Sequence, residues 1–178
     1  MSDELVYDFA VESLFRGIGK RFTPGLKAQV KALGIDPDSK LLPGYPRELW
    51  VRVVDVIARG LGPGDPVKAH RDLGAAIASG FAETTLGKVM RPAVELMGVR
   101  RLLLRLPKNL TMSNNFLKVT VHEEGPQKLR VDLTHDVPSA DFLCGVIEAM
   151  ARYAGATQCT TTHRREGGLL IIDVSWAT

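Results

Sequence analysis

The polar side chains between positions 101 and 115 are the densest group in the chain that could bind a ligand. Arginine guanidinium groups hold carboxylates and phosphates through paired hydrogen bonds, and asparagine amides can orient the bound group. The candidate ligand- or partner-binding residues are Arg101, Arg105, Asn109, Asn114 and Asn115. Asparagine and serine also satisfy backbone groups in turns, so residues 108–116 have a second interpretation as a structural joint. A solvated helix face would likewise explain the two arginines.

The two cysteines, Cys144 and Cys159, are the candidate nucleophiles of the chain. Cys144 falls on the edge of an apolar helical stripe, which is typical of a small core residue. Cys159 and His163 are four residues apart on a predicted strand, about 13 Å from each other, which is too far for proton transfer. The chain also lacks the Gly-x-Ser-x-Gly motif of a nucleophile elbow. We therefore predict no catalytic residue, and a thiol- or metal-dependent enzyme ranks third among the functions considered.

The four histidines do not form a metal-binding pattern, because no two of them are spaced four residues apart on a helix. They are His70, His122, His135 and His163. His70 lies on a predicted helix and could ligate a haem iron or another metal, but a lone helical histidine is more often solvated or hydrogen-bonded. We predict no metal site, no haem and no other cofactor.

Length and composition are those of one globular domain, predicted to span residues 1–178. Of the 178 residues, 45% are hydrophobic and 24% charged, which is enough apolar surface to offset the entropy of folding. The net charge of +3 is too small to indicate nucleic acid as the partner. No apolar stretch approaches the roughly 20 residues of a membrane span. The acidic start at residues 1–4 shows no secretory signal and the cysteines form no disulfide framework, so we expect a cytoplasmic protein.

Helical periodicity dominates residues 1–107. Thr23-Pro24 and Asp65-Pro66 each place a capping side chain before a proline, which is a strong helix start, and Gly34 is a candidate left-handed C-cap. Pro46 opens another helix, whose apolar face includes Trp50 as a predicted core residue. The expected elements are a short strand at 5–10, a helical turn at 11–16, helices at 24–33, 46–61, 66–81, 85–97 and 99–106, and an irregular connection at 35–45.

Alternation of period two takes over in residues 108–178. Residues 116–122 and 129–133 form one predicted hairpin, and residues 157–163 and 169–176 form another. A helix capped by Ser139 or Asp141 and stopped by Gly155 lies between them. The predicted fold is α+β, an N-terminal helical layer packed on a four- to five-stranded antiparallel sheet with a hairpin–helix–hairpin order at the C-terminus. The early strand at 5–10 would supply the fifth strand.

Six segments together resemble an uncharacterised paralogous family expanded in myxobacteria. They are SLFRGIG (13–19), TPGLKAQVKALGID (23–36), LLPGYPRELW (41–50), GFAETTLGK (80–88), RLPKNLTMSNNF (105–116) and GGLLIIDVSW (167–176). The C-terminal half, with its glycine-containing helix and a hairpin ending in Asp173-Val174-Ser175-Trp176, is similar to the vinyl-reductase-like and haem–nitric-oxide-binding superfamily, which includes TRAPP-type trafficking subunits. The first resemblance implies no activity, and the second implies a module that binds a small ligand or a partner.

The function that we predict is a non-catalytic regulatory or sensory module that binds a small apolar or acyl-like ligand or a protein partner. A helical layer over a small sheet can leave a pocket between the two, which is the physical basis of this expectation. A nucleic-acid-associated regulator that uses the arginine-bearing helix is the alternative. Nucleic acid is therefore an open but not favoured partner, and a homodimer is also open.

Overall fold

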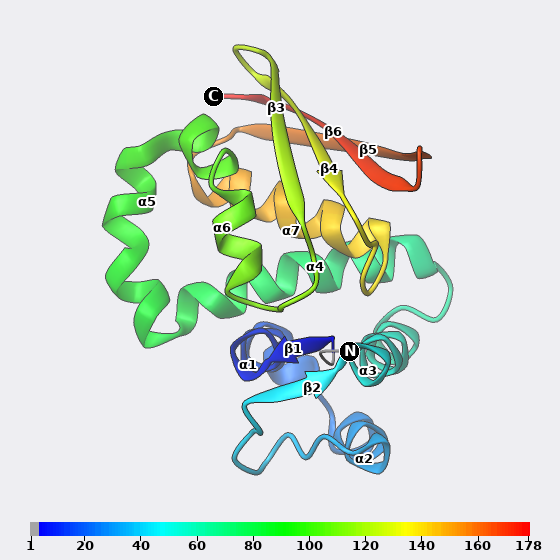
Figure 1. Ribbon diagram of the computed structural model, residues 1–178. Helices are drawn as coiled ribbons and strands as arrows, with labels where there is room; N and C mark the ends of the chain where they lie inside the picture. The colour runs from blue at the N-terminus through cyan, green and yellow to red at the C-terminus, as the bar shows by residue number, and fades with distance from the viewer. Residues whose placement is uncertain (1–3) are drawn as a thin grey trace.

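The computed structural model describes residues 4–178, apart from the side chains of Leu86 and Glu95. The first three residues of the acidic start considered above lie outside this range. In chain order the elements are β1 (Leu5–Tyr7), α1 (Asp8–Ile18), a 3₁₀ turn (Gly19–Arg21), α2 (Pro24–Leu33), β2 (Gly44–Pro46), α3 (Arg47–Leu61), α4 (Pro66–Glu83), α5 (Thr85–Leu103), α6 (Leu106–Thr111), β3 (Val119–Gly125), β4 (Lys128–Leu133), α7 (Ala140–Tyr153), β5 (Gln158–Glu166) and β6 (Leu169–Ala177). The fold is α+β, as predicted (Figure 1).

The C-terminal part is a four-stranded antiparallel sheet with strand order β3-β4-β6-β5. Both predicted hairpins are present, since β3 pairs with β4 and β5 with β6, and the two central strands place Val131 opposite Ile172. Alternate residues of β4 are buried, which is the pattern expected of a sheet with one covered face. Helix α7 covers that face (Figure 1). Ser139 caps α7 by accepting a hydrogen bond from the Phe142 amide (3.2 Å).

The early strand does not join this sheet, so the sheet has four strands, the smaller of the two numbers that the sequence left open. Strand β1 pairs instead with β2, placing Val6 opposite Tyr45, inside the connection that was predicted to be irregular. Strand β1 has only three residues, because α1 begins at Asp8. The strand contacts the segment that precedes β3, where the Tyr7 backbone amide donates a hydrogen bond to the Ser113 carbonyl (2.9 Å).

Helix α1 is longer than the predicted helical turn at 11–16. Gly17, the residue directly after the predicted turn, lies inside the helix, where it allows contact with α4. A Cβ atom at Gly17 would lie 1.8 Å from the Ala76 carbonyl oxygen, and one at Gly80 would lie 1.8 Å from the Ser13 carbonyl oxygen. Helix α4 also crosses α7 closely, because a Cβ atom at Gly145 would lie 2.1 Å from the Arg71 carbonyl oxygen. Helix α4 is therefore packed through glycines on two sides.

Local capping signals are confirmed at three positions. The Thr23 hydroxyl accepts from the Leu26 amide (3.3 Å), the Asp65 carboxylate accepts from the Lys68 amide (3.0 Å), and Gly34 ends α2 with φ 114°. These interactions are made within a few residues of the cap, which is why the sequence alone predicts them.

The two helices predicted at 85–97 and 99–106 form one element, α5, which is broken at Gly98 (φ 74°, ψ 168°). The second part ends at Leu103, and a further short helix, α6, begins at Leu106 with Pro107 in its first turn. Part of the predicted polar joint at 108–116 is therefore helical. Figure 1 shows α5 as a wide arc at the left of the molecule, beside α6.

Two groups of buried side chains meet at α7. Leu143 and Ile147 pack with the sheet, α5 and α6, whereas Phe142 and Val146 pack with α1 to α4. Trp50 is 3% exposed and meets Phe142 edge-on, with ring centroids 6.3 Å apart, so its predicted burial is confirmed. Helix α7 thereby joins the helical layer to the sheet.

Candidate functional site

An apolar cavity of about 200 Å³ lies where α1, α4, α5, α6 and α7 converge. Its walls are aromatic rings, aliphatic side chains and methionines, represented by Phe9, Phe81, Val94, Leu102, Phe142 and Met150. One water needs roughly 10–15 Å³ of such volume, so the cavity is large enough for an organic molecule. Binding sites for small molecules are typically concave and mainly apolar, with a few polar groups that fix orientation.

Arg105 is the single charged side chain among the residues that line the cavity in the described part of the chain. It lies directly before α6 and is exposed, and no carboxylate among the described residues pairs with its guanidinium group. Asn109, which also lines the cavity, is four residues further along and therefore on the same side of α6. An acidic group of a ligand would meet both side chains at the cavity edge.

The structure separates the five predicted site residues. Arg105, Asn109 and Asn114 line the cavity, whereas Arg101 and Asn115 do not. Arg101 is exposed on α5, in the part that follows the break at Gly98.

Both asparagines at 114 and 115 also hold the backbone of the joint. Asn114 is 7% exposed; its amide nitrogen donates to the Leu110 carbonyl (3.0 Å), and its amide oxygen accepts from the Leu117 backbone N–H (2.8 Å). The Asn115 side-chain oxygen accepts from the Leu5 backbone N–H (2.8 Å). These contacts correspond to the structural interpretation of residues 108–116, and Asn114 combines that role with a position in the cavity wall.

Two further polar side chains of the wall escaped the sequence analysis. The Ser13 hydroxyl on α1 and the Tyr153 hydroxyl at the end of α7 are buried at the cavity and have no hydrogen-bond partner among the described residues. Ser13 belongs to a segment quoted for its family resemblance, but neither periodicity nor spacing marks it as a site residue. Its role depends on where α1 lies relative to α4 and α7.

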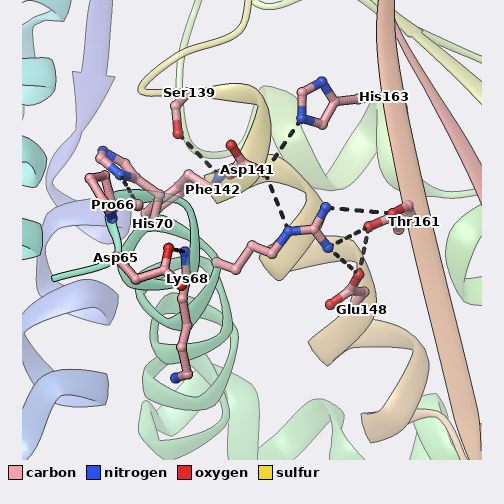
Figure 2. Close-up of polar contacts among 11 residues, drawn as sticks. Asp65, Pro66, Lys68, His70, Ser139, Asp141, Phe142, Glu148, Thr161 and His163 are labelled. Atoms are coloured by element: carbon pink, nitrogen blue, oxygen red, sulfur yellow. Dashed lines mark hydrogen bonds and ion pairs between the residues drawn. The ribbon is translucent and has the colours of Figure 1, made fainter. Parts of the chain in front are cut away.

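Arg71 on α4 lies at the centre of a half-buried side-chain network, and the sequence analysis did not single it out. Its guanidinium donates to Glu148 (2.7 Å), Asp141 (3.3 Å) and the Thr161 hydroxyl (3.2 Å). The Thr161 hydroxyl donates in turn to Glu148 (2.6 Å). Figure 2 shows Asp141, Glu148 and Thr161 gathered between α7 and β5.

This network joins the helical layer to the C-terminal part. Arg71 belongs to α4, Asp141 and Glu148 to α7, and Thr161 to β5. Helices α4 and α7 supply much of the cavity wall, including Ile77. The network therefore fixes the mutual position of two walls without entering the cavity.

Two of the histidines contact single carboxylates or a backbone carbonyl. His70 contacts the Pro66 carbonyl (2.8 Å) and Asp55 (3.1 Å), and His163 contacts Asp141 (3.4 Å) (Figure 2). Among residues 4–178, no group of three or more His, Cys, Asp or Glu side chains is arranged to hold a metal ion.

Both thiols are disfavoured as nucleophiles. Burial raises the pKa of Cys159 to about 11. Burial also raises the pKa of Cys144, and a hydrogen bond with Thr161 and the charge of Arg71 only partly oppose this effect. The thiolate is the reactive form of cysteine, so neither residue is activated at neutral pH.

Some arginines of the arginine-bearing helix and of the last hairpin are engaged with carboxylates, whereas Arg105 has no such partner among the described residues. Arg100 pairs with Glu123, Arg164 with Asp173, and Arg165 with Asp136. Within the described part of the chain, the helices are too short or too polar to cross a lipid bilayer.

Comparison with solved structures shows where this fold occurs. An oxygen-binding H-NOX domain related to soluble guanylate cyclases matches with a TM-score of 0.70 and 12% identity, over 94% of this chain and 93% of that one. A mutant H-NOX of T. tengcongensis matches with a TM-score of 0.66 and 12% identity, over 96% of each chain. At these identities the similarity shows the fold, and it confirms the haem–nitric-oxide-binding type of fold implied by the sequence.

Sequence comparison gives a more specific relationship. No curated protein matches the chain in sequence. Residues 4–177, nearly the full length, match the family described as "Protein of unknown function (DUF2378)". The chain therefore belongs to the DUF2378 family, and its own fold is similar to that of the H-NOX domains.

Proposed function

We propose that this protein is a non-catalytic sensory module that binds a small apolar or acyl-like ligand in the cavity between its helices and its sheet-covering helix. The observation that carries the proposal is the cavity itself, which is about 200 Å³ in volume and almost entirely apolar, with Arg105 at one edge. Solved structures with this fold include an oxygen-binding domain, so the fold accommodates ligand binding in another protein.

Haem is the ligand that the structural neighbours suggest, since one of them was studied for haem redox potential and porphyrin distortion. The cavity wall described here includes neither histidine nor cysteine. Methionine and Tyr153 would have to bind the iron without a histidine, and among the described lining residues Arg105 is the one cation for two propionate groups. These residues do not fit haem, and we propose an organic ligand held without a metal.

Arg105 and Asn109 point to an acidic head group on the ligand. A guanidinium group without a carboxylate partner binds a carboxylate through charge-assisted hydrogen bonds, which are stronger than neutral ones. In this arrangement the apolar body of the ligand fills the cavity and its carboxylate remains at the edge, in contact with water. Asn114 contributes part of the wall beside them.

Helix α5 is the element through which occupancy of the cavity would be sensed. Met90, Val94 and Met97 face the cavity, while Leu96 on the same helix is 87% exposed. The break at Gly98 separates this segment from the rest of α5. A ligand that fills the cavity contacts the inner face of the segment and thereby alters the position of its outer face.

Native mass spectrometry of the purified protein tests the proposal, because it reports any retained small molecule together with the oligomeric state, which the sequence left open. A binding assay with the anionic naphthalene dye ANS complements it. Ala78→Leu, which adds volume at the cavity wall, should weaken dye binding about tenfold by occluding the site. Ala28→Leu makes the same change on the exposed face of α2 and serves as the matched control. Absence of a retained molecule together with equal dye binding by both variants would refute the proposal.

A further inference from the structure

Two unpartnered hydroxyls define a polar feature inside the otherwise apolar cavity. Ser13 is 1% exposed, and its hydroxyl oxygen has no hydrogen-bond partner. The hydroxyl oxygen of Tyr153 is likewise buried and unpartnered. Both residues line the same cavity. From these two residues, and resting on the proposed function, we infer that the buried part of the ligand carries neutral oxygen acceptors of the carbonyl type, to which Ser13 and Tyr153 each donate a hydrogen bond.

The absence of partners distinguishes these hydroxyls from others in the protein. Thr84, which is 8% exposed, donates to the Phe81 carbonyl (2.7 Å), and Thr161, which is 7% exposed, donates to Glu148 (2.6 Å). Ser79 on α4 donates to the carbonyl four residues earlier (3.0 Å), a common arrangement for a helical serine. Ser13 is also helical but makes no such bond. Because nearly all buried polar groups are paired, two exceptions in one cavity indicate a missing partner.

The chemistry of the wall selects the kind of partner. Each hydroxyl can donate one hydrogen bond, and a neutral carbonyl oxygen on the ligand can accept it. A carboxylate would have no cation in the cavity wall to pair with in its buried part, because Arg105, the single charged lining residue in the described part of the chain, is exposed at the cavity edge, and Arg91 lies over the ring of Tyr153 (6.0 Å to the ring centroid) and not among the lining residues. A plain hydrocarbon would leave both hydroxyls unsatisfied. A ketone, quinone or ester on an apolar framework accepts hydrogen bonds from these hydroxyls without burying a charge.

Ser13 and Tyr153 also lie on two different walls of the cavity. Ser13 lies on α1, in the helical layer, whereas Tyr153 ends α7, which covers the sheet. Hydrogen bonds from these two residues therefore connect the ligand to α1 and to α7, in addition to its contact with α5.

The test uses a pair of probes with the same ring skeleton, 1-tetralone and tetralin, which differ by one carbonyl group. Dissociation constants of both are measured by titration of amide NMR signals for the parent, Ser13→Ala, Tyr153→Phe and the control Ser79→Ala. At least one of the two cavity variants should weaken 1-tetralone binding by about three- to tenfold, the range of a single neutral hydrogen bond, and neither should change tetralin binding. Ser79→Ala should leave both constants unchanged.

Thermal unfolding without probe gives a second readout. Removing an unpartnered buried hydroxyl eliminates an uncompensated polar group, so the melting temperatures of Ser13→Ala and Tyr153→Phe should equal or exceed that of the parent. If both probes bind and the variants weaken neither selectively, the inference is overturned while the cavity proposal stands, and water is the partner of the hydroxyls. If neither probe nor the dye binds to the parent, both are overturned.

Discussion

Replacement of Arg71 by methionine should destabilise the protein far more than the same replacement at an exposed arginine. Methionine retains most of the aliphatic length of the side chain and removes the charge and the hydrogen bonds. Glu148 and Asp141, whose side chains are 15% and 20% exposed, then lose their cation in a half-buried region. The matched control is Arg16→Met, because Arg16 pairs with Glu12 on α1 at side-chain exposures of 52% and 45%.

The expected magnitude follows from these contacts. A hydrogen bond to a charged group contributes about 1.5–3 kcal/mol, and removing one partner of a buried ion pair costs roughly 3–5 kcal/mol. Because Arg71 is 29% exposed, solvent screening places the loss at about 2–3 kcal/mol. An exposed pair four residues apart on a helix contributes about 0.3–0.5 kcal/mol, which is the loss expected for Arg16→Met. The two variants should therefore differ by about 2 kcal/mol.

Urea unfolding followed by tryptophan fluorescence measures this difference, since Trp50 and Trp176 are both buried. A second variant, Arg71→Met combined with Glu148→Leu, removes the unpaired carboxylate and should recover part of the loss. Equal unfolding free energies for Arg71→Met and Arg16→Met, or no recovery in the double variant, would refute the view that this network joins the helical layer to the sheet.

Three further predictions concern the core, the cavity and the thiols. Trp50→Ala should lower the free energy of unfolding, measured by urea unfolding, by about 3 kcal/mol. This loss is at the lower end of the range for a buried tryptophan, because Trp50 already borders a cavity. Arg105→Gln should weaken the binding of dodecanoate, measured by calorimetry, by about tenfold, whereas Arg101→Gln should not, since of these two arginines only Arg105 lines the cavity. Equal effects of the two substitutions would contradict the assignment of Arg105 to the binding of the carboxylate. Cys159, whose pKa is raised to about 11, should resist alkylation by iodoacetamide in the folded protein at about pH 8 and should react as the pH approaches its pKa. Mass spectrometry of the alkylated chain measures the extent of reaction. Rapid reaction at about pH 8 would contradict the burial of Cys159.

The local elements of the fold could be predicted because their causes lie within a few residues. Thr23, Asp65 and Ser139 each accept a hydrogen bond from a backbone amide three residues later, and alternation in β4 reflects one covered face of the sheet. Hairpin pairing follows from the short turns between strands. These signals determined the α+β class, the four strands of the main sheet and the helix that covers it.

Elements whose position depends on distant contacts were predicted less well. Strand β1 was recognised, but its partner was not, because a three-residue strand carries too little pattern to specify which edge it pairs with. Gly17 reads as a helix stop in isolation, whereas tertiary packing makes it a point of contact with α4. Intrinsic preferences are weak, and packing overrides them at such positions.

The candidate site shows the same division. Sequence reasoning located Arg105, Asn109 and Asn114 because polar residues are dense there, and these three line the cavity. It could not locate Ser13 or Tyr153, since a serine within an amphipathic helix and a tyrosine at the end of another are ordinary in sequence. They become unusual only where α1, α4 and α7 enclose a cavity and deny both hydroxyls a partner. Composition and periodicity thus determined the elements and their polar joint, whereas the convergence of helices far apart in the chain decided where a ligand can bind, because the volume and the unmet hydrogen bonds exist only after those helices have packed.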